Sequence, residues 1–263
     1  GADFAELFCE DTYENSIQML SGKIENASTK HKYGVGLRVL LDLQEVYGYT
    51  SDCSLEGILA LASKLKGAYN SSPKKIDYEF KYEDATKNGY VKINRLSKDV
   101  PQHEKISYLQ IVDDVMSGYD IRIVQRIVNI TDKTQFVTIF NTKGKYITDI
   151  RNQQRIGAQA VARDGSKSQS NGGTIGGNFD VDTFKNKDLK KFAADICEAC
   201  INMLDAPEMV GGVYPVIIHN GFGGVLFHEA CGHPLEGSAI SHNSSAFCGK
   251  LGQKIASPIV TAV

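Results

Sequence analysis

Apolar and polar residues alternate along most of the first 50 positions of the chain. Alternation with a period of two is typical of strands that bury one face, so several strands are predicted within residues 3–50. The spacing then changes to that of an amphipathic helix, which is predicted over residues 54–67 and ends at Gly67. The apolar positions of this helix are Leu55, Ile58, Leu59, Ala62 and Leu65.

Helical spacing recurs twice further along the chain. One apolar stripe predicts a helix over residues 104–120, and another predicts a helix over residues 188–204. Four consecutive strands are expected between these helices, and a short Gly-containing hairpin turn joins the second to the third. This order predicts an α+β fold, in which an N-terminal α/β domain has an antiparallel sheet with flanking helices. The four strands are residues 121–130, 135–141, 145–151 and 155–163.

Two Gly-rich stretches punctuate the second half of the chain. Residues 164–180 are interpreted as a mobile loop, because they lack the Gly-Lys-Ser/Thr ending and the following helix of a phosphate-binding loop. Pro207 and the glycines after it indicate a domain boundary. The expected division is an N-terminal scaffold domain, residues 1–206, and the beginning of a β-rich catalytic domain, residues 207–263. A strand at 213–221 and a short helix at 222–232 are predicted to open the second domain.

Composition narrows the classes of protein that fit this pattern. The chain has 263 residues, 42% hydrophobic and 23% charged, with a formal net charge of −2. Lys and Arg are scattered, so neither a nucleic-acid partner nor a membrane surface is expected. Six sparse cysteines and the absence of a signal-like start favour a reducing cytoplasm. The chain starts without Met and stops within an apolar run, so a fragment of a longer protein is expected.

The candidate chemistry lies in the sequence HEACGH, in which His228 and Glu229 are followed by His233. Histidines four apart share one face of an α-helix, but histidines five apart are rotated by about 140° from each other. Both can therefore face one metal ion only if the helix is distorted between them. Two distortions are compatible with the sequence: the helix can end at Gly232, before Pro234, or it can contain an inserted residue as in a π-bulge. The alternative is a purely structural pair of histidines at a helix end.

If a metal binds, two imidazoles favour Zn²⁺, and Glu229 is placed to act as general base on a metal-activated water. A catalytic zinc site has three protein ligands, and the motif supplies two. Cys231, Glu236, His242 and Cys248 are the nearby candidates for the third. Because each of them alone is a poor candidate, the third ligand is expected beyond Val263.

Around this motif the sequence resembles the TldD/PmbA family of metallopeptidases, also called modulators of DNA gyrase. The resemblance rests on HEACGHPLEG, on the GGVYPVIIHNGFGGVLFHE stretch before it, on GQKIASPIVTAV after it, and on an N-terminal GADFAELFCE…GKIENAS…GVGLRVL pattern. It implies that His228 and His233 are zinc ligands, that Glu229 is the base, and that a distant downstream Cys is the third ligand. The motif itself is that of the TldD-type, catalytic subunit.

The resemblance also implies a function and partners. Family substrates are unfolded or leader-type peptides that bind in an extended conformation, between the subunits of a homodimer or of a heterodimer with a PmbA/TldE-like paralogue. The expected function is thus that of a zinc-dependent peptidase. The alternative is a non-catalytic, protein-binding regulator of the gyrase-modulator type, in which the histidines are structural or hold a closed structural metal.

Overall fold

The computed structural model describes residues 2–42, 44–68, 81–84 and 93–259. The chain separates into two units, Gly1–Pro207 and Glu208–Val263. Each unit is described by itself below. Within the described ranges, every helix is too short or too polar to cross a membrane.

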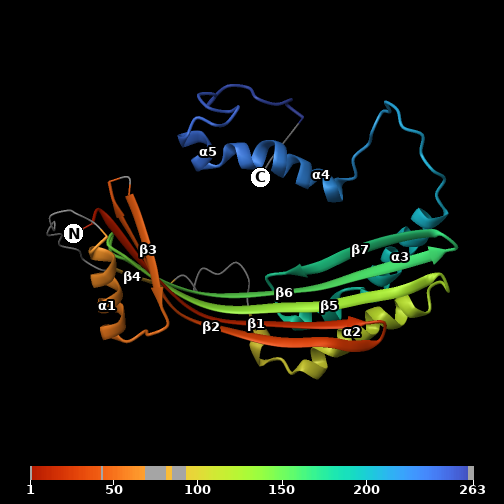
Figure 1. Ribbon diagram of the computed structural model, residues 1–263, viewed down its shortest axis with the longest axis horizontal. Coiled ribbons are helices and arrows are strands. Elements are labelled where there is room, and N and C mark those ends of the chain that lie inside the picture. The colour runs from red at the N-terminus through yellow and green to blue at the C-terminus, as the bar shows by residue number, and fades with distance from the viewer. Residues whose placement is uncertain (1, 43, 69–80, 85–92, 260–263) are drawn as a thin grey trace. The chain divides into compact units, whose positions relative to one another are not determined.

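A seven-stranded sheet forms the centre of the first unit (Figure 1). The strand order is β3-β2-β1-β5-β6-β4, and β7 also pairs with β6. All pairs are antiparallel except β4 with β6, so the predicted α+β class with an antiparallel sheet and flanking helices is confirmed. The strands are β1 Phe4–Leu20, β2 Lys23–Leu41, β3 Gln44–Thr50, β4 Lys81–Asp84, β5 Ile123–Asn141, β6 Lys145–Asp164 and β7 Lys167–Gly177.

The strands β5 and β6 are longer than predicted. Each one joins two of the four expected strands, and the hairpin turn between them is confirmed, with Gly144 at φ 76°. In the sequence, the polar residues at 131–134 suggest a break between two strands. In the structure, two of them form hydrogen bonds on the buried side of the sheet. Asp132 pairs with Lys105, and Thr134 donates a hydrogen bond to Asn152. The strand therefore continues through a stretch whose composition suggests a turn.

The interpretation of residues 164–180 as a loop is wrong, because residues 167–177 form β7. This strand pairs with β6 in an unbroken antiparallel register. A Cβ built on Gly176 would lie only 2.5 Å from the backbone oxygen of Gln154 on β6, and Gly173 faces the side chains of Ile196 and Phe192. Glycine is depleted in strands in general, but here it lets a helix lie directly on the strand backbone.

Three helices flank the sheet, and the three predicted helices are confirmed to within three residues at each end. They are α1 Leu55–Lys66, α2 Gln102–Ser117 and α3 Leu189–Asp205. The helices α2 and α3 cover one face of the long strands (Figure 1), and their apolar stripes form the main core with that face. A smaller apolar cluster joins α1 to β2.

The main core also encloses an ion pair. Nζ of Lys105, on α2, lies 2.7 Å from Oδ2 of Asp132, on β5, and each side chain is only 2% exposed. Oδ1 of Asp132 accepts a second hydrogen bond from the side-chain amide of Asn15, on β1, at 2.8 Å. The three side chains connect the helix layer to two neighbouring strands of the sheet.

The regular secondary structure of the second unit is helical. It contains α4 Asn220–Phe227, a π-helical turn His228–Gly232, a 3₁₀ turn His233–Leu235 and α5 Gly237–Ser241. The short helix predicted over 222–232 is therefore present, but its second half is π-helical.

The strand predicted at 213–221 is wrong. Residues 213–219 have no regular secondary structure, and α4 begins at Asn220. A strand needs a hydrogen-bonded neighbour, and in the described part of the chain none pairs with this segment. In the GQKIASPIVTAV stretch after the motif, residues 252–259 contain no strand, and the last four residues lie outside the described ranges.

Candidate metal centre

The helix α4 positions the first histidine. The His219 side chain accepts a hydrogen bond from the Gly221 backbone N–H at 3.0 Å, which caps the start of the helix. At the other end, the His228 N–H donates to the carbonyl oxygens of Gly224 and Val225. His228 thus continues the helical backbone and has a defined direction at the end of α4.

The π-helical turn brings the second histidine onto the same face. The His233 backbone N–H donates to the His228 carbonyl oxygen, an i→i+5 hydrogen bond. Because of this hydrogen bond, residues five apart lie on the same face of the turn. In an α-helix, the i→i+4 hydrogen bond places residues four apart in the same way. Of the two distortions that the sequence allowed, the inserted residue is the one present. Gly232 has ordinary helical angles, φ −60° and ψ −59°, so the helix does not end there.

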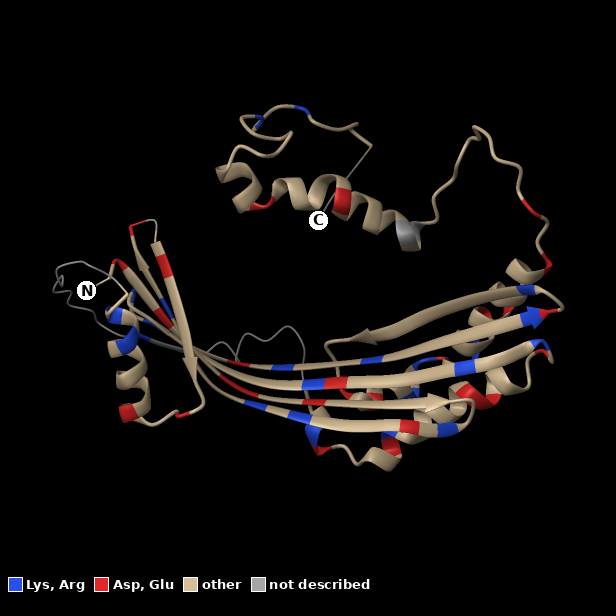
Figure 2. Ribbon diagram, in the orientation of Figure 1, with Lys and Arg blue, Asp and Glu red and all other residues tan. Residues whose placement is uncertain are grey.

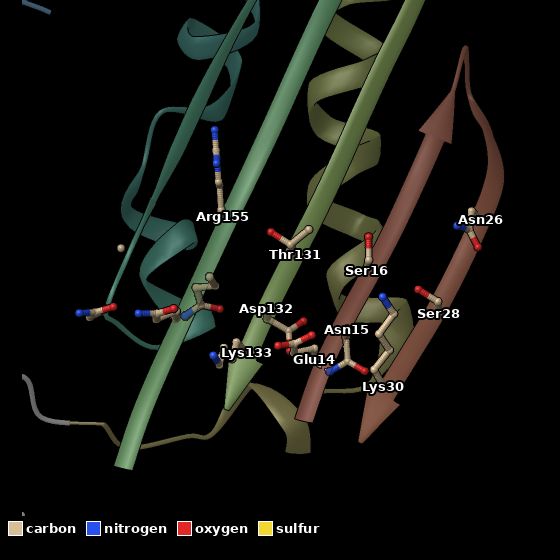
Figure 3. Close-up of a pocket in the computed structure, with 14 residues that line it drawn as sticks. Glu14, Asn15, Ser16, Asn26, Ser28, Lys30, Thr131, Asp132, Lys133 and Arg155 are labelled. Atoms are coloured by element: carbon tan, nitrogen blue, oxygen red, sulfur yellow. Dashed lines mark hydrogen bonds between the residues drawn. The ribbon is translucent and has the colours of Figure 1, made fainter. Parts of the chain in front are cut away.

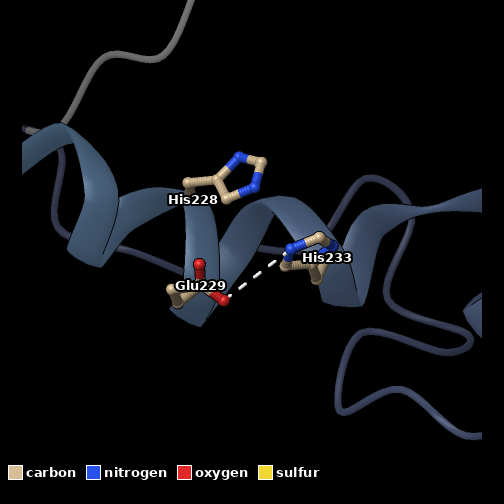
Figure 4. A group of neighbouring side chains, drawn as sticks. All are labelled: His228, Glu229 and His233. Carbon is tan, nitrogen blue, oxygen red and sulfur yellow. Dashed lines mark ion pairs between the residues drawn. The ribbon is translucent and has the colours of Figure 1, made fainter. Parts of the chain in front are cut away.

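Three side chains converge as a result (Figure 4). The two imidazole rings have centroids 4.4 Å apart and are tilted by 69°. Glu229 Oε2 lies 3.7 Å from Nε2 of His233. His228, Glu229 and His233 each offer one ligand atom, and these atoms all lie within 4.8 Å of one another. Within the described ranges this is the only group of three or more possible metal ligands.

The donor set fits a metal ion of the zinc type. Two neutral imidazoles and a nearby carboxylate are the side chains that catalytic zinc sites use. Two atoms bound to one Zn²⁺ at about 2.1 Å are separated by at most ~4.2 Å, close to the spacing in this group. The side chains of His233 and Glu229 are 51% and 64% exposed, so rotation about their side-chain bonds can close the small difference.

Glu236 has a contact that the sequence analysis missed. Its Oε1 lies 2.6 Å from Nδ1 of His233, and this hydrogen bond raises the pKa of His233 above its ordinary value. From the sequence alone, Glu236 is predicted only as a possible metal ligand. Its position three residues after His233 could have indicated this contact, because that spacing brings side chains together within a helical turn.

The other three nearby candidates do not join the group. Cys231 lies within the π-helical turn but is not among the converging side chains. Nδ1 of His242 contacts the carbonyl oxygen of Ser238 at 2.9 Å, and Sγ of Cys248 contacts that of Ile240 at 3.7 Å. None of these three side chains therefore adds a ligand atom to the group of His228, Glu229 and His233.

The first unit has a hollow of about 640 Å³ on its sheet (Figure 3). Polar side chains of four strands line most of it, and acidic and basic residues alternate with amides and hydroxyls. It contains no group of three possible metal ligands among the described residues. The lining residues are Glu14, Asn15, Ser16, Asn26, Ser28, Lys30, Thr131, Asp132, Lys133, Gln153, Gln154, Arg155, Gly177 and Asn178.

The sequence matches three domain models of one metallopeptidase family. Residues 5–68 match PmbA/TldA metallopeptidase domain 1, residues 95–204 match the central domain, and residues 211–263 match the C-terminal domain. The chain belongs to the TldD/PmbA family of metallopeptidases, as its resemblance implied.

The sequence of this chain is similar to those of several metalloproteases along almost its whole length. A metalloprotease TldD homolog of Haemophilus influenzae is 27% identical over 99% of this chain and 55% of its own length. A metalloprotease of Methanothermobacter thermautotrophicus is 26% identical over 99% of this chain and 56% of its own length. The chain therefore spans about half the length of these relatives.

Solved structures share the fold. A Thermotoga maritima protein described as a modulator of a DNA gyrase has a TM-score of 0.75 and 18% identity, covering 97% of this chain and 57% of its own. TldE from Thermococcus kodakarensis has a TM-score of 0.59 and 14% identity, covering 95% and 55%. At these identities the likeness concerns the fold alone.

Proposed function

We propose that this protein is a zinc-dependent peptidase that cleaves unfolded or leader-type peptides through a metal-activated water. The observation that carries the proposal is the convergence of His228, Glu229 and His233 at the π-helical turn. Membership of a metallopeptidase family and the names of the relatives support it.

In this proposal each residue of the group has a separate role. His228 and His233 hold the ion through ring nitrogens, and a Cys beyond Val263 supplies the third ligand, as the family resemblance implies. When bound, Zn²⁺ would lower the pKa of a coordinated water from far above neutrality to about 7. Glu229 accepts the proton of the attacking water and returns it to the nitrogen of the leaving amine. Its position next to one histidine and 3.7 Å from the other suits that task.

The two units have different roles in the proposal. Residues 1–206 form a scaffold and dimerisation domain, and residues 207–263 begin the catalytic domain. An extended peptide binds between the subunits of a homodimer or of a heterodimer with a PmbA/TldE-like paralogue, and the TldE structure among the fold neighbours is in keeping with such pairing. Basic and acidic residues are interspersed along the first unit (Figure 2), which gives no reason to propose a nucleic-acid partner. The proposed location is the cytoplasm.

Metal content and cleavage together test the proposal. Full-length protein should contain close to one zinc per chain, and the His228→Ala/His233→Ala double variant should contain none. Glu229→Gln should keep the metal but lose peptide cleavage, because it removes the proton acceptor and leaves both histidines in place. Equal zinc in the wild type and the double variant would contradict the assigned ligands. Retained cleavage by Glu229→Gln would contradict the assigned base.

The second candidate function is a non-catalytic, protein-binding regulator. It is favoured only by the description of similar structures as modulators of DNA gyrase. Binding of gyrase by the full-length protein, unchanged in the double-histidine variant and without peptide cleavage by the wild type, would favour this function over the peptidase.

A further inference from the structure

The imidazole ring of His233 lies between two carboxylates. Glu236 Oε1 is 2.6 Å from Nδ1, and Glu229 Oε2 is 3.7 Å from Nε2. Only the first distance is that of a hydrogen bond. The two nitrogens of the ring therefore have different surroundings: Nδ1 is bonded to a carboxylate, and Nε2 faces the group formed with His228.

This difference determines which nitrogen can bind a metal. A carboxylate only accepts hydrogen bonds, so Nδ1 must carry the proton that it donates to Glu236. In the neutral ring, Nε2 then has the free electron pair. We propose that Glu236 is a positioning residue, which holds the His233 ring so that Nε2 is the atom presented to the metal. This inference rests on the metal centre proposed above.

The local backbone gives Glu236 no other described role. Glu236 occupies the position before α5, but its side chain makes no capping hydrogen bond to that helix. Its backbone N–H donates to the carbonyl oxygen of His233 at 3.1 Å, which closes the 3₁₀ turn His233–Leu235. Within the described residues, His233 is the partner of the Glu236 carboxylate. The turn thus fixes the distance between the two residues although both side chains are more than half exposed.

A carboxylate or carbonyl on the second nitrogen is common for metal-binding histidines, and losing it typically lowers metal affinity by 10- to 100-fold. Zn²⁺ affinity of the full-length protein can be measured at pH 8 by competition with a chromophoric chelator. Three variants are compared with the wild type: Glu236→Ala, Glu236→Gln and the control Glu208→Ala. Glu208 is exposed, lies in the same unit and has no described side-chain partner.

Glu236→Ala should lower zinc affinity by roughly 10- to 100-fold. Glu236→Gln should lower it less, because the amide oxygen can still accept the hydrogen bond, though without its charge-assisted strength. Glu208→Ala should bind zinc as the wild type does. Absorption spectra of the Co²⁺-substituted proteins give a second readout, and the d–d bands should change in Glu236→Ala but not in Glu208→Ala.

Zinc affinity and Co²⁺ spectra of Glu236→Ala equal to those of the wild type would overturn the positioning role and leave the peptidase proposal intact. An equal loss in the alanine and glutamine variants, with lower melting temperatures of both metal-free proteins, would also overturn it, since the role would then be structural. If the His228→Ala/His233→Ala variant binds zinc like the wild type, the metal centre itself is refuted, and this inference with it.

Discussion

The buried ion pair between α2 and β5 allows the sharpest test of the first unit. Replacing Lys105 with Met keeps most of the side-chain volume but removes the ammonium group. Oδ2 of Asp132 then loses its described hydrogen-bond donor, and only the Asn15 bond to Oδ1 remains. Although Asp132 lines the hollow on the sheet, its side chain is only 2% exposed, so the charge left behind is poorly solvated.

The size of the effect follows from burial. Removing one partner of a buried ion pair costs about 3–5 kcal/mol, because the other charge stays buried without compensation. For a unit of about 200 residues, 1 kcal/mol corresponds to roughly 2–4 °C in melting temperature. Lys105→Met should therefore lower the melting temperature of the full-length protein by about 6–20 °C, measured at pH 7 by far-UV circular dichroism.

The chain contains a matched control for this variant. Lys191 and Asp195 on α3 form an ion pair of the same type and the same 2.7 Å distance, but their side chains are 69% and 54% exposed. Exposed pairs contribute about 0.2–1 kcal/mol, so Lys191→Met should change the melting temperature by a few degrees at most. A shift for Lys105→Met no larger than that for Lys191→Met would refute the reasoning from burial. Adding Asp132→Asn to Lys105→Met should recover part of the loss, because no buried charge then remains.

Two further predictions concern acid stability and the π-helical turn. Hydrogen bonds from Arg122 lower the pKa of Asp120 to about 2. Since the unfolded value is near 3.9, this contribution to stability is present above pH 4 and is lost as the pH falls towards 2; Arg122→Gln should flatten the dependence of melting temperature on pH in that range. Gly232→Ala should leave zinc content unchanged, because the added Cβ would lie 3.5 Å from Nδ1 of His228, an ordinary contact, at helical backbone angles. Loss of zinc from that variant would show that the turn requires glycine.

The helices α2 and α3 could be predicted from the sequence because their apolar stripes contact the main core. Leu109, Val112 and Met116 are all fully buried against the sheet, so the pattern directly reflects the packing. The lengths of β5 and β6 could not be predicted in this way. The polar residues that divide the pattern are satisfied by groups distant in sequence, such as Lys105 for Asp132, and such partners cannot be read from local spacing.

The errors at β7 and at residues 213–219 have a common cause. Glycines and serines in β7 indicate a loop by composition, but the strand forms because β6 supplies a complete set of backbone partners. The apolar segment 213–219 indicates a strand by composition, but within the described residues it has no such partner, and Val213 and Ile217 are almost completely exposed. Strand formation depends on a neighbour more than on residue type, and the neighbour is not a local property.

The candidate site was predictable in its residues and only partly in its geometry. The five-residue spacing excluded a regular helix and left a choice between a helix break and an inserted residue. That choice depends on which carbonyl oxygen accepts a hydrogen bond from the His233 backbone N–H. The acceptor is the His228 carbonyl oxygen, and this hydrogen bond keeps the two histidines on one face. Glu229 is still adjacent to the first histidine and lies 3.7 Å from Nε2 of the second, so the extra residue keeps the carboxylate beside both imidazoles, as H-E-x-x-H does in an α-helix. A π-helical turn loses regular i→i+4 bonding, and at this place it brings three possible metal ligands together.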